Sequence, residues 1–191
     1  MKMLIRFGSA AVLAALATPA LAHTGAEPHM HGFLAGLAHP LGGLDHMLAM
    51  IAVGIWSALA AGRRVWIVPA IFVAAMLAGA GFAQAGGALP AAETAIAMSV
   101  VALGVLIAAG VGLPVGAGAA LIALFAVFHG YAHGIEATGA VAGYMAGFAV
   151  TTAVLHVSGI ALGRAIAVVP NASRLLGAGI VASGAYLVAT L

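Results

Sequence analysis

Six long apolar segments, separated by short polar or glycine- and proline-rich breaks, make up most of the chain. Each approaches the roughly 20 apolar residues that a helix needs to cross a bilayer. Glycine, proline and arginine gather in the breaks, as at Gly62-Arg63-Arg64, Gly134 and Pro170-Asn171. The pattern predicts an all-α polytopic membrane bundle with six transmembrane helices, near residues 41–61, 65–85, 91–110, 114–131, 138–162 and 172–190.

The segment before the first span has a different pattern. Residues 1–22 have the basic start, short apolar core and Ala20-Leu21-Ala22 ending of a cleaved signal peptide. The core is too short to span a bilayer, although a retained first helix is the alternative. Residues 23–40 are expected to form a periplasmic, histidine-containing leader with a short interfacial segment. Residues 41–191 are then the six-helix transmembrane domain.

Composition supports a membrane protein and limits its chemistry. The chain is 65% hydrophobic and only 5% charged, against roughly 25% charged in soluble domains. It has no cysteine, so any metal must be held by histidine, carboxylate, methionine sulfur or backbone oxygen. The formal charge of +2 arises in the predicted signal peptide, from Lys2 and Arg6. It therefore gives no reason to expect nucleic acid as a partner.

The arginines predict an orientation in a bacterial inner (cytoplasmic) membrane. With the mature N-terminus in the periplasm, the loops after the first, third and fifth spans face the cytoplasm and hold every arginine of the mature chain. This agrees with the positive-inside rule. Glu27, Glu93, Glu136 and Asp45 then lie on or near the periplasmic side. The arginines are Arg63, Arg64, Arg164 and Arg174.

The first polar cluster opens the first span. Pro40 disfavours a helical backbone at His39, and Gly42-Gly43 indicates a bend just before the helix. Asp45 and His46 follow in the first turns of that helix.

The second polar cluster ends the fourth span. His129 and His133 are four residues apart on one helical face, a spacing that lets both imidazoles bind one metal ion. Glu136 follows them. Because this span runs outward, it brings the second cluster to the same level as the first. We therefore expect four histidines and two carboxylates at one depth near the periplasmic face.

Several other polar residues are weaker candidates. His156 lies deeper, and is either a second station on a permeation path or a packed histidine bonded to a backbone carbonyl. Glu93 is expected to cap the third span by its place near the positive end of the helix dipole. Either metal capture or a disordered leader would explain the three leader histidines, His23, His29 and His31.

Ionisable groups inside membrane spans are costly and usually mark an ion path or a site. The alternative is that each histidine is neutral and bonds a neighbouring helix. Imidazole with carboxylate suits Ni²⁺, Co²⁺, Zn²⁺ or Cu²⁺, and affinity order alone does not choose among them. Glycine spacings at Gly32/Gly36, Gly112/Gly116, Gly143/Gly147 and Gly159/Gly163 indicate close helix packing. They leave the oligomeric state open.

Two stretches carry a resemblance to a known family. The segments His39-Pro40-Leu41-Gly42-Gly43-Leu44-Asp45-His46 and Phe128-His129-Gly130-Tyr131-Ala132-His133-Gly134-Ile135-Glu136 are similar to the HupE/UreJ family of hydrogenase and urease accessory membrane proteins. The resemblance implies a secondary permease that takes Ni²⁺ or Co²⁺ as its transported substrate and supplies hydrogenase, urease or cobalamin enzymes. The positions it implies for metal handling are His39, Asp45, His46, His129, His133 and Glu136.

Two other functions are weighed against the permease. An intramembrane hydrolase could hold Zn²⁺ with His46, His129 and His133 and use Asp45 in its chemistry. A metal sensor or assembly subunit is the third interpretation. The expectation is that the chain is not an enzyme, and it has no nucleotide-binding loop that would couple transport to ATP.

Overall fold

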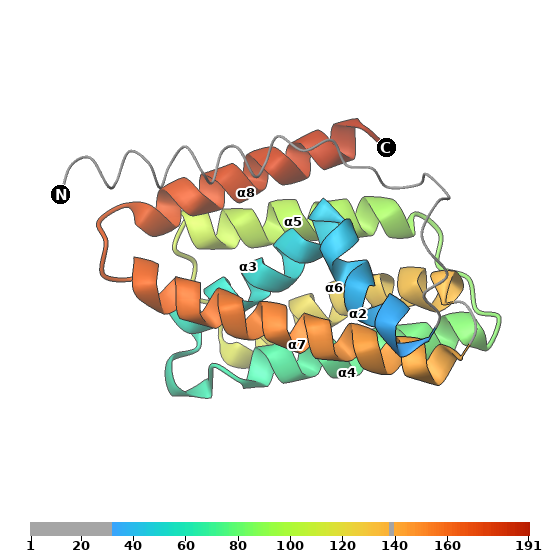
Figure 1. Ribbon diagram of the computed structural model, residues 1–191. Helices are drawn as coiled ribbons and strands as arrows, with labels where there is room; N and C mark the ends of the chain where they lie inside the picture. The colour runs from blue at the N-terminus through green and yellow to red at the C-terminus, as the bar shows by residue number, and fades with distance from the viewer. Residues whose placement is uncertain (1–31, 138–139) are drawn as a thin grey trace.

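The computed structural model describes residues 32–137 and 140–191, in which every regular element is a helix (Figure 1). This confirms the all-α prediction for that part of the chain. The predicted signal peptide and the three leader histidines lie outside the described residues. The helices are α2 (Phe33–Gly42), α3 (Leu44–Ala60), the 3₁₀ turn η1 (Gly62–Arg64), α4 (Ile67–Gln84), α5 (Ala92–Ala108), α6 (Val115–Glu136), α7 (Val141–Ile166) and α8 (Ala172–Ala189).

Each of the six predicted segments coincides with one helix from α3 to α8. Within the described residues, four of these helices, α4, α6, α7 and α8, are long and apolar enough to cross a membrane. The bent pair α2 and α3 would make a fifth span, whereas α5 is a shorter apolar helix of 17 residues. The chain is thus a helical membrane protein with four or five spans by these criteria, and the sixth stays a prediction.

The predicted bend before the first span lies between α2 and α3, whose axes differ by 86°. Gly43 links them in an extended conformation, with φ −105° and ψ 121°. The prediction of an extended His39 is wrong, because His39 and Pro40 both lie within α2. Proline lacks only one helical hydrogen bond, and α2 is held along its length by close packing on α7, where Gly36 meets the backbone of Tyr144.

Close helix packing depends on glycine, as predicted, although not at every predicted pair. A Cβ on Gly147 would meet the backbone of α2, and one on Gly159 the backbone of α3. Gly112 and Gly116 face open space instead. Gly134, predicted to break the chain, lies inside α6 because its missing side chain lets α6 approach Ala80 of α4. The strongest pairings are α4 with α6, α5 with α8, and α3 with α7.

The direction of the helices gathers the arginines at one end. Helices α4, α6 and α8 run one way, and α5 and α7 run the other (Figure 1). The η1 turn with Arg63 and Arg64 and the α7–α8 connection are therefore at the same end of the bundle. Arg164 lies in the last turn of α7 and Arg174 near the start of α8. The α6–α7 connection, which follows Glu136, is at the opposite end.

Candidate metal centre

Four imidazole rings from α2, α3 and α6 lie against one another. The His46 ring is central, with its centroid 4.4 Å from that of His133 and 5.2 Å from that of His129. His39 joins the group through His133, at 4.8 Å between centroids. The bend between α2 and α3 makes this possible, because it turns the end of α2 and the start of α3 toward the same part of α6. Segments about 90 residues apart in the chain thus contribute to one cluster.

The outer part of the cluster combines two histidines with a carboxylate. His39 Nε2 lies 2.9 Å from Glu136 Oε2, and His133 Nδ1 lies 3.5 Å from the same oxygen. One potential ligand atom from each of the three residues falls within 4.8 Å of the others. The side chains of His39 and Glu136 are 36% and 38% exposed, and that of His133 is 0% exposed. This set forms the accessible edge of the cluster.

Asp45 holds the central ring. Its Oδ1 accepts a hydrogen bond of 2.6 Å from His46 Nδ1 and another of 2.8 Å from the His46 backbone N–H. A carboxylate that accepts from one ring nitrogen fixes the tautomer and leaves the other nitrogen with a free lone pair. His46 Nε2 is that second nitrogen, and it is buried without a hydrogen-bond partner among the described residues.

His129 is fixed in the same tautomer by a different acceptor. Its Nδ1 donates to the carbonyl oxygen of Phe125, one turn earlier on α6, over 2.9 Å. Its Nε2 is buried with no partner in the described part of the chain, and the same is true of Nε2 of His133. Buried polar atoms are nearly always hydrogen-bonded. Unpaired nitrogens on neighbouring rings could therefore bind an acceptor of electron pairs, such as a metal ion.

Comparison with known proteins agrees with the resemblance read from these residues. A family model described as "HupE / UreJ protein" matches residues 11–187. The chain belongs to the HupE/UreJ family. A relative named "Protein HupE", from Rhizobium leguminosarum bv. viciae, is 46% identical over 182 residues, which cover 92% of this chain and 94% of the relative. No solved structure matches the chain.

Membership of the HupE/UreJ family confirms the resemblance and gives no support to the zinc hydrolase.

Two weaker candidates of this HupE/UreJ chain lie apart from the cluster. Glu93 is exposed in the first turn of α5, as its sequence position predicts, but the start of that helix has no side-chain cap hydrogen bond. The expected dipole position of Glu93 is therefore confirmed, while the N-cap itself is Ala91 in a left-handed conformation. His156 is buried in α7, and its Nδ1 lies 2.7 Å from the carbonyl oxygen of Met50.

Aromatic residues that the sequence did not single out enclose the cluster. Phe148 packs on His133 with a centroid distance of 3.8 Å, and Phe72 lies 5.5 Å from His129. Both are buried, on α7 and α4. Tyr144 is 5.8 Å from His39 between centroids, and its buried hydroxyl is unpaired within the described residues. Phenylalanines in apolar spans carry no local signal that would distinguish these from ordinary packing.

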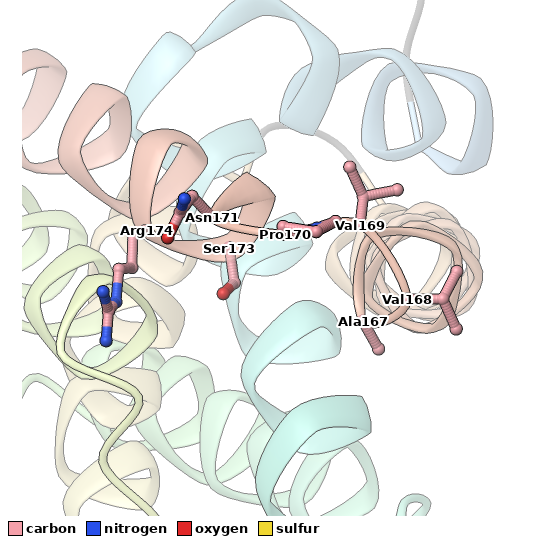
Figure 2. Close-up of a pocket in the computed structure, with 7 residues that line it drawn as sticks. All are labelled: Ala167, Val168, Val169, Pro170, Asn171, Ser173 and Arg174. Carbon is pink, nitrogen blue, oxygen red and sulfur yellow. The ribbon is translucent and has the colours of Figure 1, made fainter.

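Two hollows of the fold lie away from the histidine cluster. A pocket of about 420 Å³ surrounds the α7–α8 connection, with lining residues from Ala167 to Arg174 (Figure 2). A second, of about 310 Å³, lies beside it between α3 and the α5–α6 connection, and includes Trp56. Both are at the arginine end of the bundle. Neither is lined by a histidine.

Proposed function

We propose that this chain is a secondary permease that imports Ni²⁺ or Co²⁺ across the bacterial inner membrane through a His/Asp/Glu site near the periplasmic face. The observation that carries the proposal is the set of four adjoining imidazoles, in which buried nitrogens of His46, His129 and His133 lack partners among the described residues. Membership of the HupE/UreJ family supports it, because the resemblance to that family implies a nickel or cobalt permease.

The gradient of exposure suggests an order of events. A hydrated cation first meets Glu136 and His39, which are partly exposed. The carboxylate offsets part of the cost of removing water from a dication in a low-dielectric setting. The ion then passes to the buried nitrogens of His133 and His46. Asp45 holds the His46 ring in place through its hydrogen bond to Nδ1. Imidazole nitrogen suits nickel and cobalt as well as zinc and copper, so the ligands alone do not set selectivity.

The proposed topology has a cleaved signal peptide, a periplasmic N-terminus and six spans. The shared end of Arg63, Arg64, Arg164 and Arg174 supports it, because positive residues concentrate on the cytoplasmic side. Metal entry would then follow the membrane potential, at about 2.3 kcal/mol per charge per 100 mV, or a proton gradient. The imported metal would serve hydrogenase, urease or cobalamin enzymes.

Uptake of radiolabelled nickel and cobalt by cells tests the proposal. Cells expressing the wild type should accumulate one or both metals above empty-vector cells. His46→Ala and His133→Ala should each reduce that uptake about ten-fold or more at limiting metal, because each removes a ligand. Ser99→Ala is the matched control, since Ser99 is buried on α5 and, among the described residues, its hydroxyl bonds only to Ile96 of its own helix.

All variants must be present in the membrane at equal amounts. Wild-type uptake equal to that of empty-vector cells would contradict the permease for these metals. Full uptake by well-expressed His46→Ala and His133→Ala would show that the metal enters by another route.

A further inference from the structure

His156 has the features of a metal ligand. It lies at 1% exposure in the middle of α7, and its Nε2 is buried with no hydrogen-bond partner within the described residues. Its Nδ1 must donate to Met50, because the carbonyl oxygen of Met50 can only accept. The tautomer therefore leaves a lone pair on Nε2. Metal-binding histidines characteristically donate their other nitrogen to a backbone carbonyl in this way.

The hydrogen bond orients the ring and is not needed by its acceptor. Met50 lies in the interior of α3, where a carbonyl already accepts from the N–H four residues later. If His156 served only packing, its Nε2 would stay buried and unpaired at a cost in free energy, and the bond to Met50 would offset little of that cost. The residue is also costly in a membrane span compared with any apolar side chain of similar size.

The surroundings of His156 connect it with the outer cluster. Phe72 of α4 contacts the rings of both His156 and His129, at centroid distances of 4.9 Å and 5.5 Å. One turn nearer the outer end, Thr152 donates to the sulfur of Met76 over 3.8 Å. Both of these side chains are fully buried. A hydroxyl and a soft thioether thus lie one helical turn from His156 and from Phe72, respectively.

We propose that His156 is an inner metal station, at which Nε2 receives the cation after it leaves the outer cluster. The inference rests on the proposed function and adds a second site to it. The inner ligand atom is an imidazole nitrogen, Nε2, which faces no hydrogen-bond partner among the described residues. A single imidazole suits borderline divalent ions better than the hard ions Mg²⁺ and Ca²⁺, which prefer oxygen ligands. It would hold an ion less firmly than the outer cluster, which favours onward movement.

The variant that tests this station is His156→Asn. The asparagine amide can still donate to Met50 from near the position of Nδ1, but it has no atom at the position of Nε2. The fold is therefore kept while the ligand nitrogen is removed. Purified protein is titrated with Co²⁺ to count bound ions, and entry of Co²⁺ into sealed proteoliposomes is followed with an enclosed metal indicator.

We expect the wild type to bind two Co²⁺ ions and His156→Asn to bind one. The maximal rate of entry should fall about ten-fold, while the Co²⁺ concentration for half-maximal rate changes by less than about two-fold, because the outer cluster is intact. His133→Ala should instead shift the concentration dependence. Ser99→Ala should match the wild type in both assays.

Equal stoichiometry and equal entry in His156→Asn and wild type would overturn the inner station while leaving the permease standing. A wild type that neither binds nor admits Co²⁺ or Ni²⁺ would overturn both, and so distinguishes the two failures. If His156→Asn is poorly folded, as judged by thermal unfolding, His156→Gln supplies the second test. It places an amide near Nε2, and the same loss of one bound ion is expected.

Discussion

At the scale of single residues, three buried histidines share one tautomer for three different reasons. Nδ1 donates to the carboxylate of Asp45 in His46, to Phe125 in His129 and to Met50 in His156. In each case Nε2 is left unprotonated, with a lone pair available to a metal ion. The first of these bonds joins adjacent residues, but the sequence indicated only their proximity, because neighbouring residues on a helix point in different directions. The bond of His156 joins residues 106 apart, so only the folded chain reveals it.

Asp45 is expected to act by holding His46 rather than by dominating the charge of the site. Asp45→Ala should weaken Co²⁺ binding by about 10- to 100-fold, the usual cost of losing such a partner. Asp45→Asn should cost less, because its amide oxygen can still accept from Nδ1. Equilibrium titration of purified protein measures both values. Equal losses in the two variants would instead assign the effect to the negative charge itself.

At the scale of elements, the bend between α2 and α3 determines the geometry of the cluster. The sequence predicted the bend from Pro40 and Gly42-Gly43, and the structure has it at 86°. It did not predict that His39 is helical, because the preference of a residue before proline is local and is overridden by packing of α2 on α7. Similarly, the glycine at position 134 predicted a break between helices. Gly134 instead lies within α6 and allows its close contact with α4.

Two neighbouring glycines at the bend allow a matched test of the Asp45–His46 pair. A Cβ on Gly43 would lie 2.7 Å from Asp45 Oδ1 and 3.0 Å from His46 Nδ1, whereas a Cβ on Gly42 meets nothing within 4 Å. Gly43→Ala should therefore displace the Asp45–His46 pair and reduce uptake about ten-fold at limiting metal. Gly42→Ala should leave uptake unchanged. Equal uptake by both variants at equal expression would show that this pair tolerates displacement.

At the scale of the whole molecule, hydropathy predicted which segments are helical but not how they assemble. The apolar segments correspond to α3 through α8 because length and composition are properties of each segment alone. The pairing of α4 with α6 and of α5 with α8 depends on contacts between glycines and distant backbones. The enclosure of His133 by Phe148 is likewise a tertiary result. It therefore had no local signal.

The absence of cysteine from the chain makes its orientation measurable with single cysteines. Val168→Cys, in the α7–α8 connection where the side chain is 84% exposed, should react with a membrane-impermeant thiol reagent only after the inner membrane is opened. Ala88→Cys, exposed in the α4–α5 connection, should react from the periplasm. The physical reason is the placement of arginines on the cytoplasmic side. The reverse pattern would invert the proposed topology.

A double-mutant cycle on metal binding tests whether α3 and α6 contribute ligands to one metal site. Co²⁺ affinity would be measured for purified wild type, His46→Ala, His133→Ala and the double variant. Because the rings lie 4.4 Å apart, their effects should be coupled, so the double variant should lose clearly less affinity than the product of the single losses. Losses that multiply would place the two histidines in independent sites and contradict the account.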